Sequence, residues 1–99
     1  MSYFVYILKC CDKSYYVGST SNMEKRLEKH NAGQGSTWTA KRLPVELVYL
    51  ERHSDKSTAQ KREKQLKGWS RAKKEALING ELELLRKLSN SHSTMERNH

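Results

Sequence analysis

The chain has 99 residues, of which 35% are hydrophobic, so it can bury one modest core and no second domain. Lys and Arg number 19 against 11 Asp and Glu, and the resulting net charge of +8 favours a polyanionic partner such as nucleic acid. A strand pattern follows Met1 directly, without a basic leader or a long apolar stretch, which predicts a cytoplasmic protein with no membrane contact.

Two short segments rich in aromatic and β-branched residues open the chain. The first is the apolar run Tyr3–Leu8 and the second is Tyr15–Val17. Residues of these types favour strands, and the polar residues 12–14 between the two segments are typical of a turn. The pattern predicts a β-hairpin.

A helix is predicted over about residues 22–31. Ser21 and Glu24 have the spacing of a capping box at its start. Gly33 can take the left-handed conformation that often ends a helix.

Two cationic side chains share the apolar side of this helix. At roughly 100° per residue, Arg26 and His30 fall within about 60° of Met23, on the stripe that also includes Leu27. They are therefore expected to lean toward the sheet. Two interpretations stay open at this point: a functional pair, or side chains that extend from the core edge or pair with a carboxylate.

The polar loop from Gly33 to Leu43 combines hydroxyls, one large ring and two positive charges. Such a loop can hold phosphates and stack a base, but it can equally be a surface connector whose tryptophan packs inward. Its candidate nucleic-acid-binding residues are Thr37, Trp38, Lys41 and Arg42.

A third strand is predicted from Pro44 to about Glu51. A proline is tolerated at the first position of a strand. Because side chains alternate along a strand, Val45, Leu47 and Tyr49 are expected to share one face.

The next helix is predicted to begin near Asp55 and to stop before Gly68. Its inward stripe contains Ala59 and Leu66, and Glu63 lies between them. A carboxylate on a buried side requires a positive partner, either an arginine or a divalent cation. A structural salt bridge from Glu63 to Arg26 would satisfy this requirement without any catalytic role.

A last helix is predicted from Ser70, as its cap, to Ile78, followed by a leucine-rich segment at residues 81–88. We expect residues 1–88 to form the folded domain. Residues 89–99 contain almost no apolar side chains and are predicted to be a disordered tail.

The positive charge is concentrated between residues 61 and 74. A basic face of this kind favours nucleic acid, although it can also be only a solvated surface. The candidate nucleic-acid-binding residues of this segment are Lys61, Arg62, Lys64, Lys67, Arg71, Lys73 and Lys74.

The paired tyrosine motifs resemble those of the GIY-YIG nuclease family. Phe4–Tyr6 stands in place of the first triplet and Tyr16–Gly18 in place of the second. Arg26 and His30 match the arginine and histidine of the family's first helix, and Glu63 matches its metal-binding glutamate. The chain looks like the small stand-alone members of this family.

The resemblance implies an α/β (α+β) fold with a small three-stranded, mainly antiparallel sheet flanked by three or more helices. It also implies a metal-dependent endonuclease that cuts phosphodiester bonds, with DNA favoured over RNA and with branched or damaged DNA among the expected repair substrates. One divalent ion, Mg²⁺ or Mn²⁺, would be held by Glu63. The ion and the protein would together stabilise negative charge that develops during hydrolysis.

The same resemblance implies roles for the remaining site residues. Arg26 would stabilise the transition state, and Tyr6 or Tyr16 would activate or orient the attacking water. A free tyrosine titrates near about 10, so it needs nearby positive charge to act as a base. His30, with an unperturbed pKa near about 6.5, is the alternative proton acceptor.

The chain departs from the family pattern at Ser19, where many relatives carry a lysine. A cation is therefore missing directly after the second triplet. Lys9, Lys41 or Arg42 are candidates to approach from elsewhere in the chain.

Two alternatives need no catalysis. One is a nucleic-acid-binding module that keeps the fold and the basic face but cuts nothing. The other is an adaptor that supplies DNA grip to a partner enzyme, in which case a protein partner would provide substrate specificity.

Overall fold

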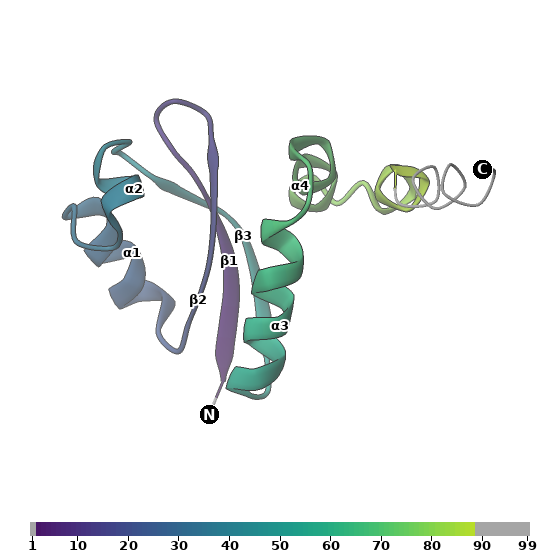
Figure 1. The fold of residues 1–99 in the computed structure, drawn as a ribbon. Helices are drawn as coiled ribbons and strands as arrows, with labels where there is room; N and C mark the ends of the chain where they lie inside the picture. Colours follow the sequence, from purple (N-terminus) through teal and green to yellow (C-terminus); the bar gives the residue numbers. More distant parts are fainter. Residues whose placement is uncertain (1, 89–99) are drawn as a thin grey trace. The chain divides into compact units, whose positions relative to one another are not determined.

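The computed structural model describes residues 2–88 and is built on a three-stranded antiparallel sheet (Figure 1). Its strands are β1 (Tyr3–Lys9), β2 (Tyr15–Thr20) and β3 (Glu46–His53), in the order β2-β1-β3. The predicted hairpin is thus confirmed, and its turn includes Lys13 with a φ of 70°. Because β1 is central, β2 is an edge strand.

Four helices accompany the sheet: α1 (Met23–Asn31), α2 (Thr37–Ala40), α3 (Lys56–Lys67) and α4 (Arg71–Ile78). Residues 82–88 are also helical. These elements confirm the predicted α/β class with its flanking helices.

Most helix ends agree with the caps expected from the sequence. Asp55 caps α3 and Ser70 caps α4, each accepting a hydrogen bond from a backbone N–H three residues on. The predicted capping box of α1 was wrong, because Asn22 rather than Ser21 is the N-cap and its side chain accepts from the Lys25 N–H at 3.1 Å. Asparagine is among the strongest N-cap residues, so it competes well with the preceding serine.

The segment expected to be a loop contains the short helix α2. Ser36 is its N-cap, and the Ser36 Oγ accepts from the Thr39 N–H at 3.0 Å. A single helical turn has no room for a repeating apolar stripe, so periodicity in the sequence did not indicate it.

Strand β3 differs from the prediction in two ways. It begins at Glu46, so Pro44 lies before the strand rather than at its first position. A register shift places Leu47 opposite Leu8 but Tyr49 opposite Ile7. Opposed residues share a face of the sheet, so this β-bulge turns Tyr49 to the face opposite Leu47, and the prediction that the two share a face was wrong.

Both faces of the central strand are covered. Val5, Tyr6, Ile7 and Leu8 are all fully buried. Figure 1 shows α1 and α2 on one side of the sheet and α3 on the other. Tyr6 and Leu8 belong to a cluster that includes Met23 and Leu27 of α1, whereas α3 contacts the sheet with the buried residues Ala59 and Leu66 on its inward side.

The described residues divide into two compact units, the first ending at Gly68 and the second beginning at Trp69. The first unit holds the sheet with α1, α2 and α3. The second holds α4, whose Ala76 and Leu77 are buried. No helix within residues 2–88 is long and apolar enough to cross a membrane. The predicted tail at residues 89–99 lies outside the described residues.

Candidate functional site

Tyr6 is at the centre of a polar cluster on the α1 side of the sheet. It is fully buried and lies directly opposite Gly18 in the β1–β2 ladder. A Cβ added at Gly18 would lie 2.5 Å from the Tyr6 Cζ, so only a glycine leaves room for the ring to cross β2 at this point. The glycine of the second triplet therefore lets the tyrosine of the first reach the edge of the sheet.

Arg26 and His30 of α1 both meet the Tyr6 hydroxyl. The Arg26 Nε donates to the Tyr6 Oη at 3.2 Å, and the His30 Nε2 lies 3.0 Å from the same oxygen. Burial raises the pKa of Tyr6, although the hydrogen bond from Arg26 partly opposes this effect. The same bond raises the pKa of Arg26, which is therefore fully charged.

His30 is fully buried and continues the network into α2. Its Nδ1 lies 2.9 Å from the Thr39 Oγ1, and the Thr39 hydroxyl also meets the Ser36 Oγ at 2.8 Å and donates to the Ser36 carbonyl oxygen at 3.3 Å. Burial lowers the pKa of His30, and the charge of Arg26 lowers it further, so the ring is neutral at pH 7.

These contacts assign a direction to the network. A neutral imidazole has one N–H donor and one acceptor nitrogen. Because the Arg26 Nε is a donor, the acceptor that contacts the Tyr6 O–H within residues 2–88 is the His30 Nε2, so the proton of the neutral ring is on Nδ1 and is donated to the Thr39 hydroxyl. The His30 Nε2 is then the acceptor, and the Tyr6 O–H donates to it. Hydrogen bonds run in one direction from Arg26 through Tyr6 and His30 to Thr39.

Tyr16 lies beside this network with its ring partly exposed. Its ring centroid is 5.2 Å from that of His30 and 6.4 Å from that of Tyr6. Trp38 stacks on it at 6.0 Å, and the Arg42 guanidinium lies 4.0 Å from the Trp38 ring centroid. No other residue within 2–88 hydrogen-bonds the Tyr16 hydroxyl, which is free to meet a water or a substrate.

Glu63 of α3 is held from two sides. Its Oε1 accepts from the Ser19 Oγ at 2.5 Å, and its Oε2 pairs with the Lys67 Nζ at 2.7 Å. Burial raises the pKa of Glu63, but the hydrogen bonds from Lys67 and Ser19 outweigh this and bring the pKa below that of an ordinary glutamate. The carboxylate is therefore ionised at neutral pH.

Glu63 approaches the site from the other face of β2. Ser19 pairs with Val5, one residue along from the Tyr6–Gly18 pair, so its side chain points to the face opposite Tyr6. The open possibility of an ion pair between Glu63 and Arg26 is not realised, since the ion-pair partner of Glu63 in the described chain is Lys67. The charge of Glu63 nevertheless contributes, after larger effects of burial and hydrogen bonding, to the raised pKa of both Tyr6 and Arg26.

Glu63 can serve as the anchor of a divalent cation. Within residues 2–88, no group of three or more His, Cys, Asp or Glu side chains could hold a metal ion. Mg²⁺, however, usually keeps several waters and needs only one or two carboxylates besides a substrate phosphate. Glu63 fits that requirement because it is ionised, and the Lys67 side chain, 54% exposed, can move aside.

A hollow of about 160 Å³ opens at Arg26. It is lined by Thr20, Asn22, Lys25, Arg26 and Lys29, and we call it the Arg26 hollow. Only the Nε of Arg26 takes part in a hydrogen bond or ion pair with another described residue, so its terminal nitrogens are left for a ligand. A charged guanidinium with a free planar fork is well suited to a phosphate.

Comparison with known proteins supports the same family as the motifs. Residues 2–76 match the GIY-YIG catalytic domain. The chain belongs to the GIY-YIG family. This confirms the resemblance expected from the sequence. GIY-YIG catalytic domains are generally endonuclease domains that act on nucleic acid and typically use divalent metal ions.

The chain is similar to UPF0213 proteins, a group of small stand-alone GIY-YIG proteins. One from Natronomonas pharaonis is 49% identical over 76 residues, which cover 77% of this chain and 89% of the relative. Another, from Staphylococcus aureus strain Mu3, is 51% identical over 77 residues, covering 78% of this chain and 94% of the relative.

Two solution NMR structures share the fold. The UPF0213 protein of Bacillus halodurans is 39% identical with a TM-score of 0.53, covering 80% of this chain and 84% of that one. A protein from E. faecalis is 38% identical with a TM-score of 0.57, covering 81% and 85% respectively.

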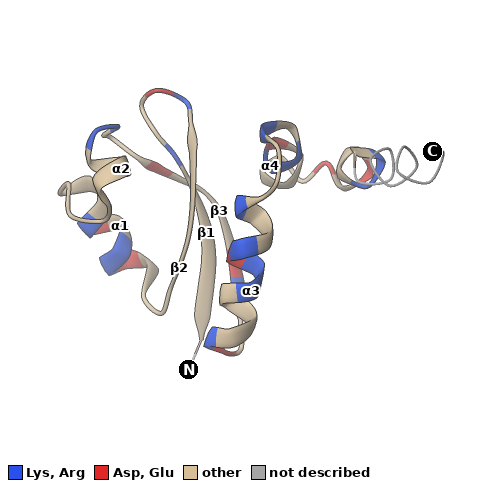
Figure 2. Ribbon diagram, viewed as in Figure 1, with Lys and Arg blue, Asp and Glu red and all other residues tan. Residues whose placement is uncertain are grey.

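Some basic residues of the first unit of this GIY-YIG protein form ion pairs with carboxylates, whereas others are exposed. Figure 2 shows Lys and Arg along α3 and α1. Lys61 and Lys64 of α3 are exposed, whereas Arg62 pairs with Glu51 at 3.0 Å. Lys67 pairs with Glu63 as described above.

The predicted binding residues of the α2 segment are also divided. Thr37 and Lys41 are exposed, and Trp38 is 37% exposed while it packs on Tyr16. Arg42 forms an ion pair with Asp12 at 3.1 Å. Trp38 packs on Tyr16, as expected for a surface connector, but part of its ring is exposed, as expected for a loop that stacks a base. The structure thus has features of both interpretations.

Three predicted binding residues lie in the second unit, which we describe by itself. Arg71 pairs with Glu75 at 3.3 Å, and the Lys73 Nζ lies 4.6 Å from the Trp69 ring centroid. Burial lowers the pKa of Lys74. These basic side chains are thus partly engaged within their own unit.

Sequence reasoning missed Ser36 and Thr39, which support His30, and the lysines Lys25 and Lys29 beside Arg26. Serine followed three residues later by threonine has the spacing of an N-cap motif, and this signal could have indicated α2. The contact of Thr39 with His30 had no sequence signal.

Replacing Gly18 with alanine is expected to destabilise the fold by about 1–3 kcal/mol, because the new Cβ overlaps the Tyr6 ring. Denaturant unfolding followed by circular dichroism measures this. Gly68→Ala is the matched control, since a Cβ there would meet nothing closer than the Gln65 carbonyl oxygen at 3.5 Å. Equal stability of the two variants would contradict the close packing of Tyr6 on β2.

Proposed function

We propose that this protein is a metal-dependent endonuclease that hydrolyses phosphodiester bonds in DNA. The observation that carries the proposal is the state of Arg26. Its Nε is held by the buried Tyr6 hydroxyl, its terminal nitrogens have no hydrogen-bond or ion-pair partner among residues 2–88, and its side chain lines a hollow. A guanidinium fixed in this way can bind phosphoryl oxygens and stabilise the charge that they gain during hydrolysis.

The role we assign to Tyr6 and His30 is to position Arg26. Both are fully buried, and each uses its polar atoms within the network. His30 holds the Tyr6 proton, which leaves a lone pair of the Tyr6 oxygen for the Arg26 Nε–H. Preorganised donors of this kind need no rearrangement when charge develops in the transition state.

We assign contact with the attacking water to Tyr16. Among Tyr6, Tyr16 and His30, only Tyr16 is partly exposed. Its hydroxyl also lacks a hydrogen-bond partner within residues 2–88. Arg26 is the positive charge of the cluster, and positive charge favours the phenolate form of a tyrosine, which is the form that accepts a proton.

Glu63 would hold the divalent ion, Mg²⁺ or Mn²⁺. When bound, such an ion supplies Lewis-acid stabilisation of the phosphoryl oxygens. Glu63 and Arg26 lie on opposite sides of the edge strand β2, so we place the substrate strand across this edge. Ser19 and Lys67 keep the carboxylate ionised and oriented in the absence of substrate.

A purely nucleic-acid-binding role is favoured by one observation, the Glu63–Lys67 ion pair at 2.7 Å. If this pair is only structural, the domain grips DNA without cutting it, alone or as an adaptor for a partner enzyme. Such a binder would show salt-sensitive affinity but no product with Mg²⁺ or Mn²⁺.

The test is incubation of the purified chain with labelled flaps, forks, four-way junctions and single strands in the presence of Mn²⁺ or Mg²⁺. We expect cleavage products with metal and none with EDTA, and we expect the branched flaps, forks and junctions to be cut in preference to the single strands. Binding without cleavage of any substrate would reject the endonuclease and support the binding module.

Replacing Thr39 with valine is expected to lower the cleavage rate about 10-fold, because the His30 Nδ1–H loses its acceptor and the ring is no longer held in one tautomer. Thr39→Ser keeps the hydroxyl and should restore the rate. The ¹⁵N signals of the His30 ring report the tautomer independently of activity. At pH 6.5, where half of unperturbed histidines are protonated, we expect less than half of the wild-type His30 to be protonated because its pKa is lowered.

An unchanged His30 tautomer in Thr39→Val, with unchanged cleavage, would show that Thr39 does not position the ring. A lower rate with an unchanged tautomer would assign the effect to packing instead.

A further inference from the structure

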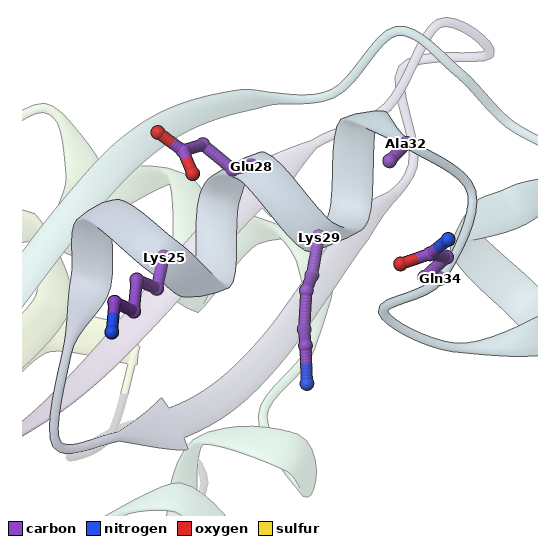
Figure 3. A pocket seen from close by; sticks show the side chains of 5 residues that line it. All are labelled: Lys25, Glu28, Lys29, Ala32 and Gln34. Atoms are coloured by element: carbon purple, nitrogen blue, oxygen red, sulfur yellow. The ribbon is translucent and has the colours of Figure 1, made fainter.

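A second hollow lies along α1, beside the Arg26 hollow. Its volume is about 340 Å³, and we call it the α1 hollow. It is lined by Lys25, Glu28, Lys29, Ala32 and Gln34 (Figure 3). Lys25 and Lys29 line both hollows, so the two are neighbours along the helix.

Two lysines and one glutamate line the α1 hollow, so its net charge is positive. Figure 3 shows Lys25 and Lys29 leaving the same side of α1, whereas Glu28 leaves the other side. Both lysines are exposed, and neither forms an ion pair with a residue in the range 2–88. On α3, by contrast, Arg62 and Lys67 already pair with carboxylates. Lys25 and Lys29 are the unengaged lysines of the helix that carries Arg26.

We propose that the α1 hollow binds the phosphate backbone of the nucleic-acid strand that flanks the bond at Arg26. This inference rests on the proposed function, because it takes Arg26 as the contact for the reacting phosphate. It adds Lys25 and Lys29 as substrate-binding residues and Gln34 as a polar contact to sugar or phosphate oxygens.

The spacing of these side chains matches a nucleic-acid strand. Lys25 and Lys29 are four residues apart, which corresponds to about 6 Å along the helix axis. A strand of DNA carries one phosphate per roughly 3.4 Å of axis, so the two lysines can contact phosphates that are one or two nucleotides apart. A cavity needs only about 10–15 Å³ to hold one water, so the hollow of 340 Å³ has room for phosphate groups with their hydration.

The size of the hollow and the free amide of a glutamine also favour a strand over a bare anion. A free phosphate would need only the Arg26 hollow, where three cations meet. The α1 hollow extends the positive surface by a further turn toward Ala32 and Gln34, in the direction that a continuing backbone would take.

The experiment measures binding of a fluorescein-labelled forked DNA in EDTA, so that no cleavage is required. We compare the wild type, Lys25→Gln/Lys29→Gln, and the charge-matched control Lys13→Gln/Lys56→Gln, whose lysines are exposed and lie outside both hollows. Fluorescence anisotropy over a range of salt concentrations gives the affinity and its salt dependence. Amide NMR signals of residues 25–34, with and without the DNA, report the location of the contact.

We expect the α1 double variant to lose affinity about 10-fold or more, and the slope of log K against log salt to fall by about 2, as for two lost phosphate contacts. In the control variant Lys13→Gln/Lys56→Gln, the affinity and the salt slope should change much less. Equal losses in the two variants, or unshifted amide signals in residues 25–34, would overturn the inference. Retention by anionic lipid vesicles instead of DNA would also overturn it.

These outcomes separate the inference from the proposed function. DNA binding that depends on α1, without cleavage by the wild type in Mn²⁺, supports the α1 site and rejects hydrolysis. Cleavage that continues while the α1 variant binds as the wild type does supports hydrolysis and rejects the α1 site.

Discussion

Replacing Glu63 with alanine or glutamine is expected to abolish metal-dependent cleavage. Glu63 is the ionised carboxylate at the edge of β2, and no group of three or more His, Cys, Asp or Glu side chains within residues 2–88 could hold the ion in its place. A neutral glutamine keeps the shape but loses the charge that a hard divalent cation requires. The measurement is product formation over a Mn²⁺ titration.

Glu51→Gln is the matched control for this prediction. Glu51 is also a largely buried carboxylate, with 21% of its side chain exposed against 20% for Glu63. It accepts from Tyr49, His53 and Arg62 and lies on β3, away from the edge strand β2. We expect this variant to lose about 1–3 kcal/mol of stability, since three hydrogen-bond donors lose a charged acceptor, but to keep its activity.

The comparison between the two carboxylates excludes a general effect of destabilisation. If Glu63→Gln and Glu51→Gln cleave DNA equally well, then Glu63 does not anchor a metal, and its bonds to Ser19 and Lys67 are structural only. If Glu63→Gln retains DNA binding while cleavage disappears, the loss belongs to the chemical step.

Replacing Arg26 with alanine is expected to lower the cleavage rate by about 10² or more, the usual effect of removing one donor to a developing negative charge. This corresponds to about 2.7 kcal/mol of transition-state stabilisation. The loss should appear in kcat in single-turnover experiments, because the interaction strengthens as the phosphoryl oxygens gain charge.

Two further variants test how Arg26 works. Arg26→Lys keeps the charge but lacks the Nε–H that bonds Tyr6 and the planar fork, so we expect it to recover only a small part of the rate. Arg52→Ala removes an exposed arginine whose Nε bonds the Ser2 hydroxyl, and it should cut as the wild type does. Full activity in Arg26→Lys would mean that charge alone matters and that the bond to Tyr6 does not.

Elements with strong local signals were predictable. The hairpin followed from two aromatic and β-branched segments around a polar turn, and α3 and α4 followed from Asp55 and Ser70 at their starts. The bulge that reverses Tyr49 was not predictable, because alternation in a sequence assumes an unbroken ladder and the pairing with β1 breaks it at Ile7 and Leu8.

The candidate site, like the fold, was predictable where it depends on local sequence. The sequence alone determined the types of side chain that gather near the hairpin and their order along the chain, because the spacing of a motif and the phase of a helix are local properties. Arg26 and His30 accordingly share one side of α1 and meet Tyr6.

Only the tertiary structure decided which polar groups become partners. Glu63 meets Ser19 and Lys67 instead of Arg26, and Thr39 of a helix that has no periodic signal becomes the support of His30. The physical reason is that such contacts join residues far apart in the chain or in an irregular segment. They depend on how α1, α2 and α3 pack on the two faces of the sheet, and no local pattern in the amino-acid sequence encodes that packing.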